Sequence, residues 1–144
     1  MPEGLPAPVR LVLATDLVLV RAARKMLEGL LHAQGWEEET VEEVALVATE
    51  LVQNAIEHGS KNDGTETSEL VMWLEDDAVI LEMIDPGTGK DPSLLLNRDV
   101  EQPIPLDAAR GRGLFLVNRL ARRFERSREE SGGCRVRARM EADA

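Results

Sequence analysis

Residues 40–59, TVEEVALVATELVQNAIEHG, form the stretch that decides the fold. Apolar residues recur in it at helical spacing, which predicts a long helix with one buried face. They are Val41, Val44, Ala48, Leu51, Val52 and Ala55. The run from Thr40 to Glu43 has the pattern of a capping box at the helix start. Gly59 is expected to end the helix in a left-handed conformation.

A row of polar residues lies on the opposite face of this predicted helix: Glu43, Glu50, Asn54 and Glu57. A carboxylate one turn from a carboxamide is typical either of a solvated surface or of a site that binds a metal and a phosphate. An asparagine gains nothing obvious in the middle of a helix, because it is a mediocre helix former. His58, beside Gly59, either stabilises the helix terminus as a cation or lies near a phosphate.

The bulk composition predicts one cytoplasmic domain over residues 1–144. The net charge of −10 argues against a direct nucleic-acid binder. Residues 1–88 hold 18 acids and 5 bases, whereas residues 89–144 hold 9 acids and 12 bases, which suits either phosphate handling or ordinary charge scatter. The single Cys134 excludes an internal disulfide. No apolar run is long enough for a membrane span, and the first eight residues lack the features of a signal peptide.

Around the central helix, the pattern predicts one more helix before it and two hairpins after it. Asp16 is a candidate cap for the first helix, and Gly35 is its expected terminator. A further short helix should follow a glycine pair late in the chain. The predicted elements are a strand over Val9–Ala14, a helix over Leu17–Gln34, strands over Glu69–Glu75 and Val79–Ile84, a helix over Leu114–Phe124, and strands over Glu125–Glu130 and Cys134–Met140.

Two Gly-x-Gly elements flank a long, proline-containing loop at Lys90–Arg110. Glycines let a backbone approach a ligand closely, and a helix start favours anions. The first element, Gly87 and Gly89, is not a P-loop, because the lysine that follows is not succeeded by Ser or Thr. The second, Gly111 and Gly113, lacks the third glycine of a dinucleotide fingerprint. Each element alone is equally typical of turns and caps.

The combination of these motifs is more specific than any one of them. In order, the chain gives Glu50-x3-Asn54-x3-His58 on a helix, Asp85-x-Gly87-x-Gly89 after a strand, a long loop, and a Gly-x-Gly that opens another helix. This order resembles the Bergerat-fold, or GHKL, ATPases, over roughly Val9 to Met140. The runs ELVQNAIEHG and GRGLFLV resemble the small anti-sigma factor serine/threonine-protein kinases. The resemblance implies a two-layer α/β sandwich, with helices on one face of a mixed, largely antiparallel sheet.

The resemblance also implies roles for individual residues. Asn54 corresponds to the ligand of Mg²⁺, and Glu50 to the general base. Asp85 corresponds to the carboxylate that binds the adenine amino group. The remaining nucleotide-binding positions are His58, Gly87, Gly89, Gly111 and Gly113, with residues 90–110 as the ATP lid and Arg110 as a catalytic cation near the γ-phosphate. Cys134 occupies a position where the family usually has a threonine, which puts tight ATP binding in doubt.

The function implied by the resemblance is that of an ATP- and Mg²⁺-dependent serine/threonine protein kinase that regulates transcription. It would bind a sigma factor as an anti-sigma factor and phosphorylate an antagonist protein, and family members commonly form homodimers. Two alternatives stay open. One is a nucleotide-sensing binding module with little phosphotransfer, and the other is the detached ATPase domain of a histidine kinase.

Overall fold

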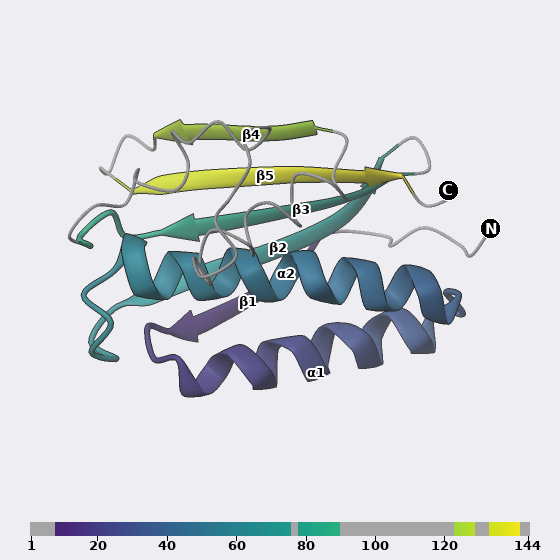
Figure 1. Cartoon of the computed structure of the whole chain (residues 1–144), viewed down its shortest axis with the longest axis horizontal. Coiled ribbons are helices and arrows are strands. Elements are labelled where there is room, and N and C mark those ends of the chain that lie inside the picture. Colours follow the sequence, from purple (N-terminus) through teal and green to yellow (C-terminus); the bar gives the residue numbers. More distant parts are fainter. Residues whose placement is uncertain (1–7, 76–77, 90–122, 129–132, 142–144) are drawn as a thin grey trace, which may run out of the picture.

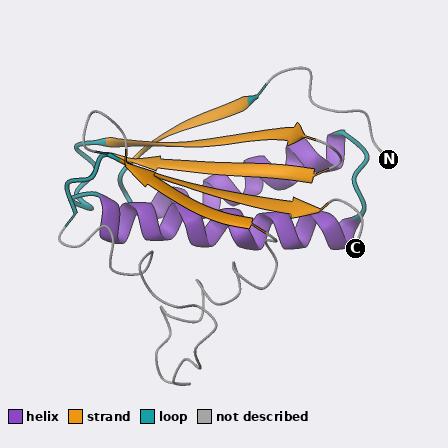
Figure 2. Ribbon diagram, turned by 90° about the horizontal axis from the view of Figure 1, so that it is seen from above, coloured by secondary structure: helices purple, strands orange, loops and turns teal. Residues whose placement is uncertain are grey.

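The protein is a two-layer α/β sandwich in which both helices cover the same face of one sheet (Figures 1 and 2). This computed structural model describes residues 8–75, 78–89, 123–128 and 133–141. The predicted fold class is confirmed. The elements in chain order are β1 (Val9–Ala14), α1 (Val18–Ala33), α2 (Glu38–Gly59), β2 (Thr67–Glu75), β3 (Ala78–Asp85), β4 (Arg123–Arg128) and β5 (Cys134–Glu141).

The sheet has five strands in the order β1-β2-β3-β5-β4. All four pairings between these strands are antiparallel, so the parallel pairing that a mixed sheet implies is not found among the described strands. The strand predicted at Val9–Ala14 is confirmed, as are both predicted hairpins. The register places Asp85, at the end of β3, opposite Cys134, at the start of β5.

The first helix, Val18–Ala33, is one residue shorter at each end than predicted, and its cap position is Leu17 rather than Asp16. The Asp16 carboxylate accepts a hydrogen bond from the Val18 N–H at 3.0 Å, which satisfies a free donor of the first turn. Gly35 follows the helix with a φ of +82°, a conformation that favours glycine. The imidazole of His32 lies 2.7 Å from the carboxylate of Glu38 and joins the end of α1 to the start of α2.

The central helix differs from its prediction at both ends. It begins at Glu38, not at Thr40, and its cap residue Glu37 makes no side-chain capping hydrogen bond. The capping box is therefore wrong, and two acids in the first turn complement the helix dipole instead. Gly59 is the last helical residue and is not among the described glycines with positive φ, so the predicted left-handed stop is also wrong.

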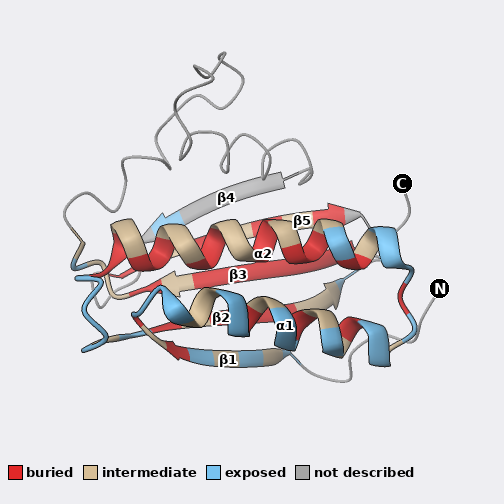
Figure 3. Cartoon of the chain, turned by 60° about the horizontal axis from the view of Figure 1, so that its bottom comes forward, coloured by how far each residue is buried: buried red, intermediate tan, exposed pale blue. Residues whose placement is uncertain are grey.

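The core lies between the sheet and the helices (Figure 3). All six apolar residues predicted on the buried face of α2 are buried, and Ala45, Val47 and Ile56 extend that face. The sheet contributes every second residue along its strands to this core, such as Leu70 and Met72 on β2 and Leu81 on β3. Among the described residues, no helix has both the length and the apolar character needed to cross a membrane.

The prediction of a last helix is wrong at the two of its residues that the structure describes. The helix predicted over residues 114–124 would include Arg123 and Phe124, but β4 begins at Arg123. The rest of that predicted helix lies outside the described residues, as do the loop at residues 90–110, Arg110, Gly111 and Gly113.

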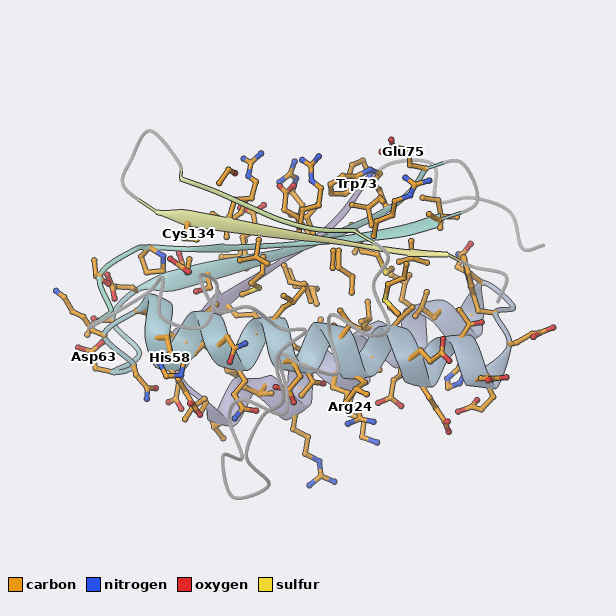
Figure 4. The ribbon with its side chains drawn as sticks, turned by 45° about the horizontal axis from the view of Figure 1, so that its top comes forward. Arg24, His58, Asp63, Trp73, Glu75 and Cys134 are labelled. Carbon is orange, nitrogen blue, oxygen red and sulfur yellow. The ribbon has the colours of Figure 1, made fainter. Side chains whose placement is uncertain are left out.

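A buried carboxylate stabilises the face of the sheet that lies away from the helices, where Figure 4 shows Trp73 and Glu75. Glu82 on β3 is 5% exposed. It accepts a hydrogen bond from the Arg137 Nε at 2.8 Å and lies 3.3 Å from the Arg135 Nε. The Arg137 guanidinium also stacks over the Trp73 ring, 5.2 Å from its centroid.

We expect Glu82→Gln to lower the free energy of unfolding by about 1–3 kcal/mol, because it removes the charge that both arginines face. Urea denaturation measures this loss. Arg10→Gln is the matched control, because Arg10 forms a single ion pair with Glu69 at the surface, where removal changes stability by roughly 0–1 kcal/mol. Equal effects of the two substitutions would contradict the stabilising role of Glu82.

Candidate functional site

Three segments that are distant in sequence meet at one end of the molecule. They are the C-terminal turns of α2, the turn that follows β3, and the start of β5. Figure 4 shows His58 and Cys134, from the first and last of these, at the same end. The antiparallel pairing of β3 with β5 brings Asp85 and Cys134 side by side, and the Thr88 N–H donates to the Gly59 carbonyl at 3.2 Å.

The Asp85 carboxylate lies at the centre of this end and is 7% exposed. Its Oδ1 accepts hydrogen bonds from the Gly87 N–H at 2.8 Å and the Cys134 N–H at 3.3 Å. Its other oxygen, Oδ2, faces Gly59. Two backbone donors on one oxygen fix the plane of the carboxylate, because a carboxylate oxygen accepts along defined lone-pair directions.

Glycines allow three backbone segments to close around Asp85 and His58. A Cβ placed on Gly59 would lie 2.2 Å from the Asp85 Oδ2, and one on Gly133 would lie 2.3 Å from the Asp85 carbonyl oxygen. A Cβ on Gly89 would lie 1.9 Å from the His58 carbonyl oxygen. Gly87 is favoured for another reason, because its φ of +73° lies in a region that side chains disfavour.

The polar row of α2 contains two side chains that the described part of the protein leaves uncommitted. Thr49 donates to the Ala45 carbonyl at 2.7 Å, and Gln53 donates to Glu57 at 3.1 Å. Glu50 and Asn54, which lie on the same helix, are half-buried and form no hydrogen bond with any described residue. A half-buried carboxylate and carboxamide one turn apart are therefore available to a ligand.

The surroundings of Glu50 favour the neutral, protonated form of its carboxyl more than water does. Burial raises the pKa of the Glu50 carboxyl above its ordinary value, and the nearby Glu57 carboxylate raises it further. Glu57 lies 3.7 Å from the His58 Nε2, and that nitrogen is buried without a hydrogen-bond partner among the described residues. A raised pKa in a general base brings it closer to the operating pH.

Of the residues predicted for the site, His58, Asp85, Gly87 and Gly89 lie at this end of the molecule, and Glu50 and Asn54 lie earlier on α2. Glu50, Asn54 and His58 follow one another along α2, and Gly59 connects them to Asp85 by direct contact. Arg110, Gly111 and Gly113 lie outside the described residues, so their predicted roles stay predictions.

Sequence reasoning missed two contacts at this end. Gly133 has no predicted role, although its lack of a side chain admits the Asp85 carbonyl. The hydroxyl of Thr88 donates to the carboxylate of Glu66, which lies in the loop between α2 and β2. A glycine immediately before the last strand was a usable signal for the first contact, whereas no local pattern indicates the second.

Comparison with known proteins decides the family. The family described as the histidine kinase-like ATPase domain matches residues 13–140. The chain belongs to this family. Histidine kinase-like ATPase domains bind ATP, which agrees with the carboxylate, the glycine contacts and the uncommitted polar row described above. No curated protein matches the sequence.

Solved structures show the same fold as this histidine kinase-like ATPase domain. The RsbU and RsbW domains of Rv1364c from Mycobacterium tuberculosis are 19% identical with a TM-score of 0.67, covering 94% of this chain and 32% of that one. The SiaB-SiaC complex from Pseudomonas aeruginosa is 19% identical with a TM-score of 0.68, covering 92% and 88%. The chain therefore spans about a third of the first structure and most of the second.

Proposed function

We propose that this domain is an ATP-dependent serine/threonine protein kinase of the anti-sigma factor type. It binds a sigma factor until an antagonist protein displaces it, and it then phosphorylates that antagonist on a serine or threonine. The observation that supports this most strongly is the contact of Gly59 with Asp85, because it connects the polar row of α2 to the turn after β3.

In this proposal Asp85 selects the adenine base. Its Oδ1 accepts two backbone N–H groups, which fixes the carboxylate, and a carboxylate can only accept hydrogen bonds, so it suits a donor on the base. An adenine amino group is a donor, whereas guanine presents a carbonyl acceptor at the same ring position. Gly59 keeps a side chain away from this carboxylate, and Gly133 does the same for the Asp85 backbone carbonyl. ATP is therefore preferred over GTP.

Glu50 and Asn54 act at the phosphate end. The Glu50 carboxylate accepts the proton of the attacking hydroxyl while the hydroxyl oxygen bonds to the γ-phosphorus, and the bond to the β-phosphate oxygen breaks to release ADP. The Asn54 carboxamide oxygen is a suitable ligand for Mg²⁺, which neutralises phosphate charge. No cluster of three acidic, histidine or cysteine ligands exists among the described residues, so the phosphates and water would complete the coordination.

The structures named for RsbW and for the SiaB-SiaC complex support the choice of partner class, because a domain with this fold occurs in each. His58, Arg110, Gly111 and Gly113 are assigned to the phosphates in the same proposal, with residues 90–110 as the lid of a single domain. We also propose that the domain binds a sigma factor, forms a homodimer and is located in the cytoplasm.

The test is transfer of label from γ-labelled ATP to the antagonist protein, with Mg²⁺ present. The proposal expects the label on a serine or threonine of the antagonist and none without the metal. Label that reaches only water, or only other proteins, would contradict it.

A nucleotide-sensing module is the second candidate, and Cys134 favours it. This residue donates its backbone N–H to Asp85, but its side chain is a thiol, which is a weak hydrogen-bonding group. Regulation of the sigma factor that survives Glu50→Gln would support this candidate, whereas regulation lost together with phosphotransfer supports the kinase.

A further inference from the structure

The turn that contains Gly87 and Gly89 is held in place from outside the site. Within the turn, the Gly87 N–H bonds to the Asp85 Oδ1. From α2, the Gly59 carbonyl accepts the Thr88 N–H at 3.2 Å. From the loop that precedes β2, the Glu66 carboxylate accepts the Thr88 hydroxyl, with oxygen–oxygen distances of 2.6 and 2.8 Å.

Glu66 is itself fixed by two other segments. Its Oε1 accepts the Lys61 N–H at 3.0 Å. Its backbone pairs with the buried Thr15, whose N–H donates to the Glu66 carbonyl at 3.0 Å. The Thr15 hydroxyl accepts the Glu66 N–H at 3.3 Å. These contacts, which do not involve Thr88, position Glu66 and its carboxylate.

We infer that Glu66 is a positioning residue for the nucleotide site. It acts through the Glu66–Thr88 tether, by which we mean the hydrogen bond between its carboxylate and the Thr88 hydroxyl. The tether holds the Asp85–Gly89 turn in the conformation that binds adenine. This inference rests on the proposed nucleotide function, but it concerns a residue that the resemblance assigns no role.

The chemistry of the tether agrees with this role. The pKa of the Glu66 carboxyl is lowered, first by the Thr88 hydroxyl and then by the Lys61 N–H. The carboxylate is thus the form that the surrounding donors stabilise. Thr88 lies between the half-buried Gly87 and Gly89, and its own side chain is exposed, so the hydroxyl reaches Glu66 at the surface.

The experiment compares ATP and ADP affinity by calorimetry across a set of variants. Glu66→Ala and Thr88→Val each remove the tether and should weaken both nucleotides by the same factor, roughly 3- to 10-fold. The double variant should lose no more than Glu66→Ala alone, because Glu66→Ala already removes the hydrogen bond that Thr88→Val removes. Glu66→Gln keeps an acceptor oxygen and should bind within about twofold of the unmodified protein. Glu69→Ala is the control, since it removes an acid from β2 that pairs with Arg10.

A second measurement does not depend on nucleotide. In the free protein, amide hydrogen exchange at residues 87–89 should be faster in Glu66→Ala and Thr88→Val, and unchanged in Glu66→Gln and Glu69→Ala. Unchanged exchange, or additive losses of affinity in the double variant, would overturn the inference. If the unmodified protein binds no ATP while exchange responds as expected, the proposed function fails and the tether stands as a structural contact only.

Discussion

Replacing Glu50 with glutamine is expected to lower the rate of phosphotransfer by roughly 10²- to 10⁴-fold, the range that a general base contributes. The same change should raise the melting temperature at neutral pH. Glutamine has nearly the same shape as glutamate and occupies the same space beside Asn54, so nucleotide affinity should stay close to that of the unmodified protein. A substitution that lowers activity while it raises stability is typical of a functional-site residue.

The sign of the stability change follows from the pKa. The folded protein raises the pKa of Glu50 above its ordinary value of 4.5, through burial and through Glu57. Ionisation of Glu50 therefore lowers stability as the pH rises through the folded pKa. Glutamine removes that loss, so the gain in stability should be larger at pH 8 than at pH 5 and should vanish below pH ~4, where the glutamate is protonated in both states.

Label transfer at saturating ATP and thermal melts at these pH values measure these effects. The matched control is Glu43→Gln, which changes an acid two helical turns earlier in the same polar row. That variant should transfer phosphate at the normal rate. A Glu50→Gln rate within about threefold of normal would show that the carboxylate is not the base.

Replacing Gly59 with alanine should weaken ATP binding by about tenfold or more and destabilise the fold by roughly 1–3 kcal/mol. The added Cβ would lie 2.2 Å from the Asp85 Oδ2, so the carboxylate must move. Asp85 is held by the Gly87 and Cys134 N–H groups, and a shift weakens both hydrogen bonds.

Gly29→Ala is the control for this substitution. Gly29 lies within α1, and a Cβ there meets no atom within 4 Å. Alanine should raise stability there by roughly 0.5–1 kcal/mol, because it favours the helical conformation more than glycine does. Urea denaturation and calorimetry separate the two positions. Normal ATP affinity in a folded Gly59→Ala protein would contradict the assignment of Asp85 to the nucleotide.

Local periodicity was enough to predict most of the fold. The apolar face of α2, the strand at Val9–Ala14 and both hairpins follow from spacings of 3.6 and 2 residues, which burial on one face imposes. The start of α2 was predicted too late, because Thr40 and Glu43 match a cap pattern that the chain does not use. The connection from α1 is short, and in it the buried Trp36 donates its backbone N–H to the Leu31 carbonyl at 3.2 Å.

The candidate site was predicted in its residues but not in its contacts. The resemblance assigns Glu50, Asn54 and Asp85 to it, and the structure places them on one helix and at one strand end, while their roles stay predictions. The reasons for Gly59 and Gly133 depend on where Asp85 lies in space, and each is distant from it along the chain. The Glu66–Thr88 tether likewise joins residues 22 positions apart, so no local pattern indicates it.

Titration calorimetry of ATP binding, with and without Mg²⁺, tests the central claim most directly when the unmodified protein is compared with Asp85→Asn. The amide of that variant would present a donor in place of the Asp85 Oδ2, because the two backbone N–H groups hold its oxygen at the Oδ1 position. Asp63→Asn, on the surface loop after α2, is the control. We expect one ATP per chain, tighter binding with Mg²⁺, and a loss of about tenfold or more in Asp85→Asn alone. Equal ATP affinity of Asp85→Asn and the unmodified protein, or no binding by the unmodified protein, would contradict the claim.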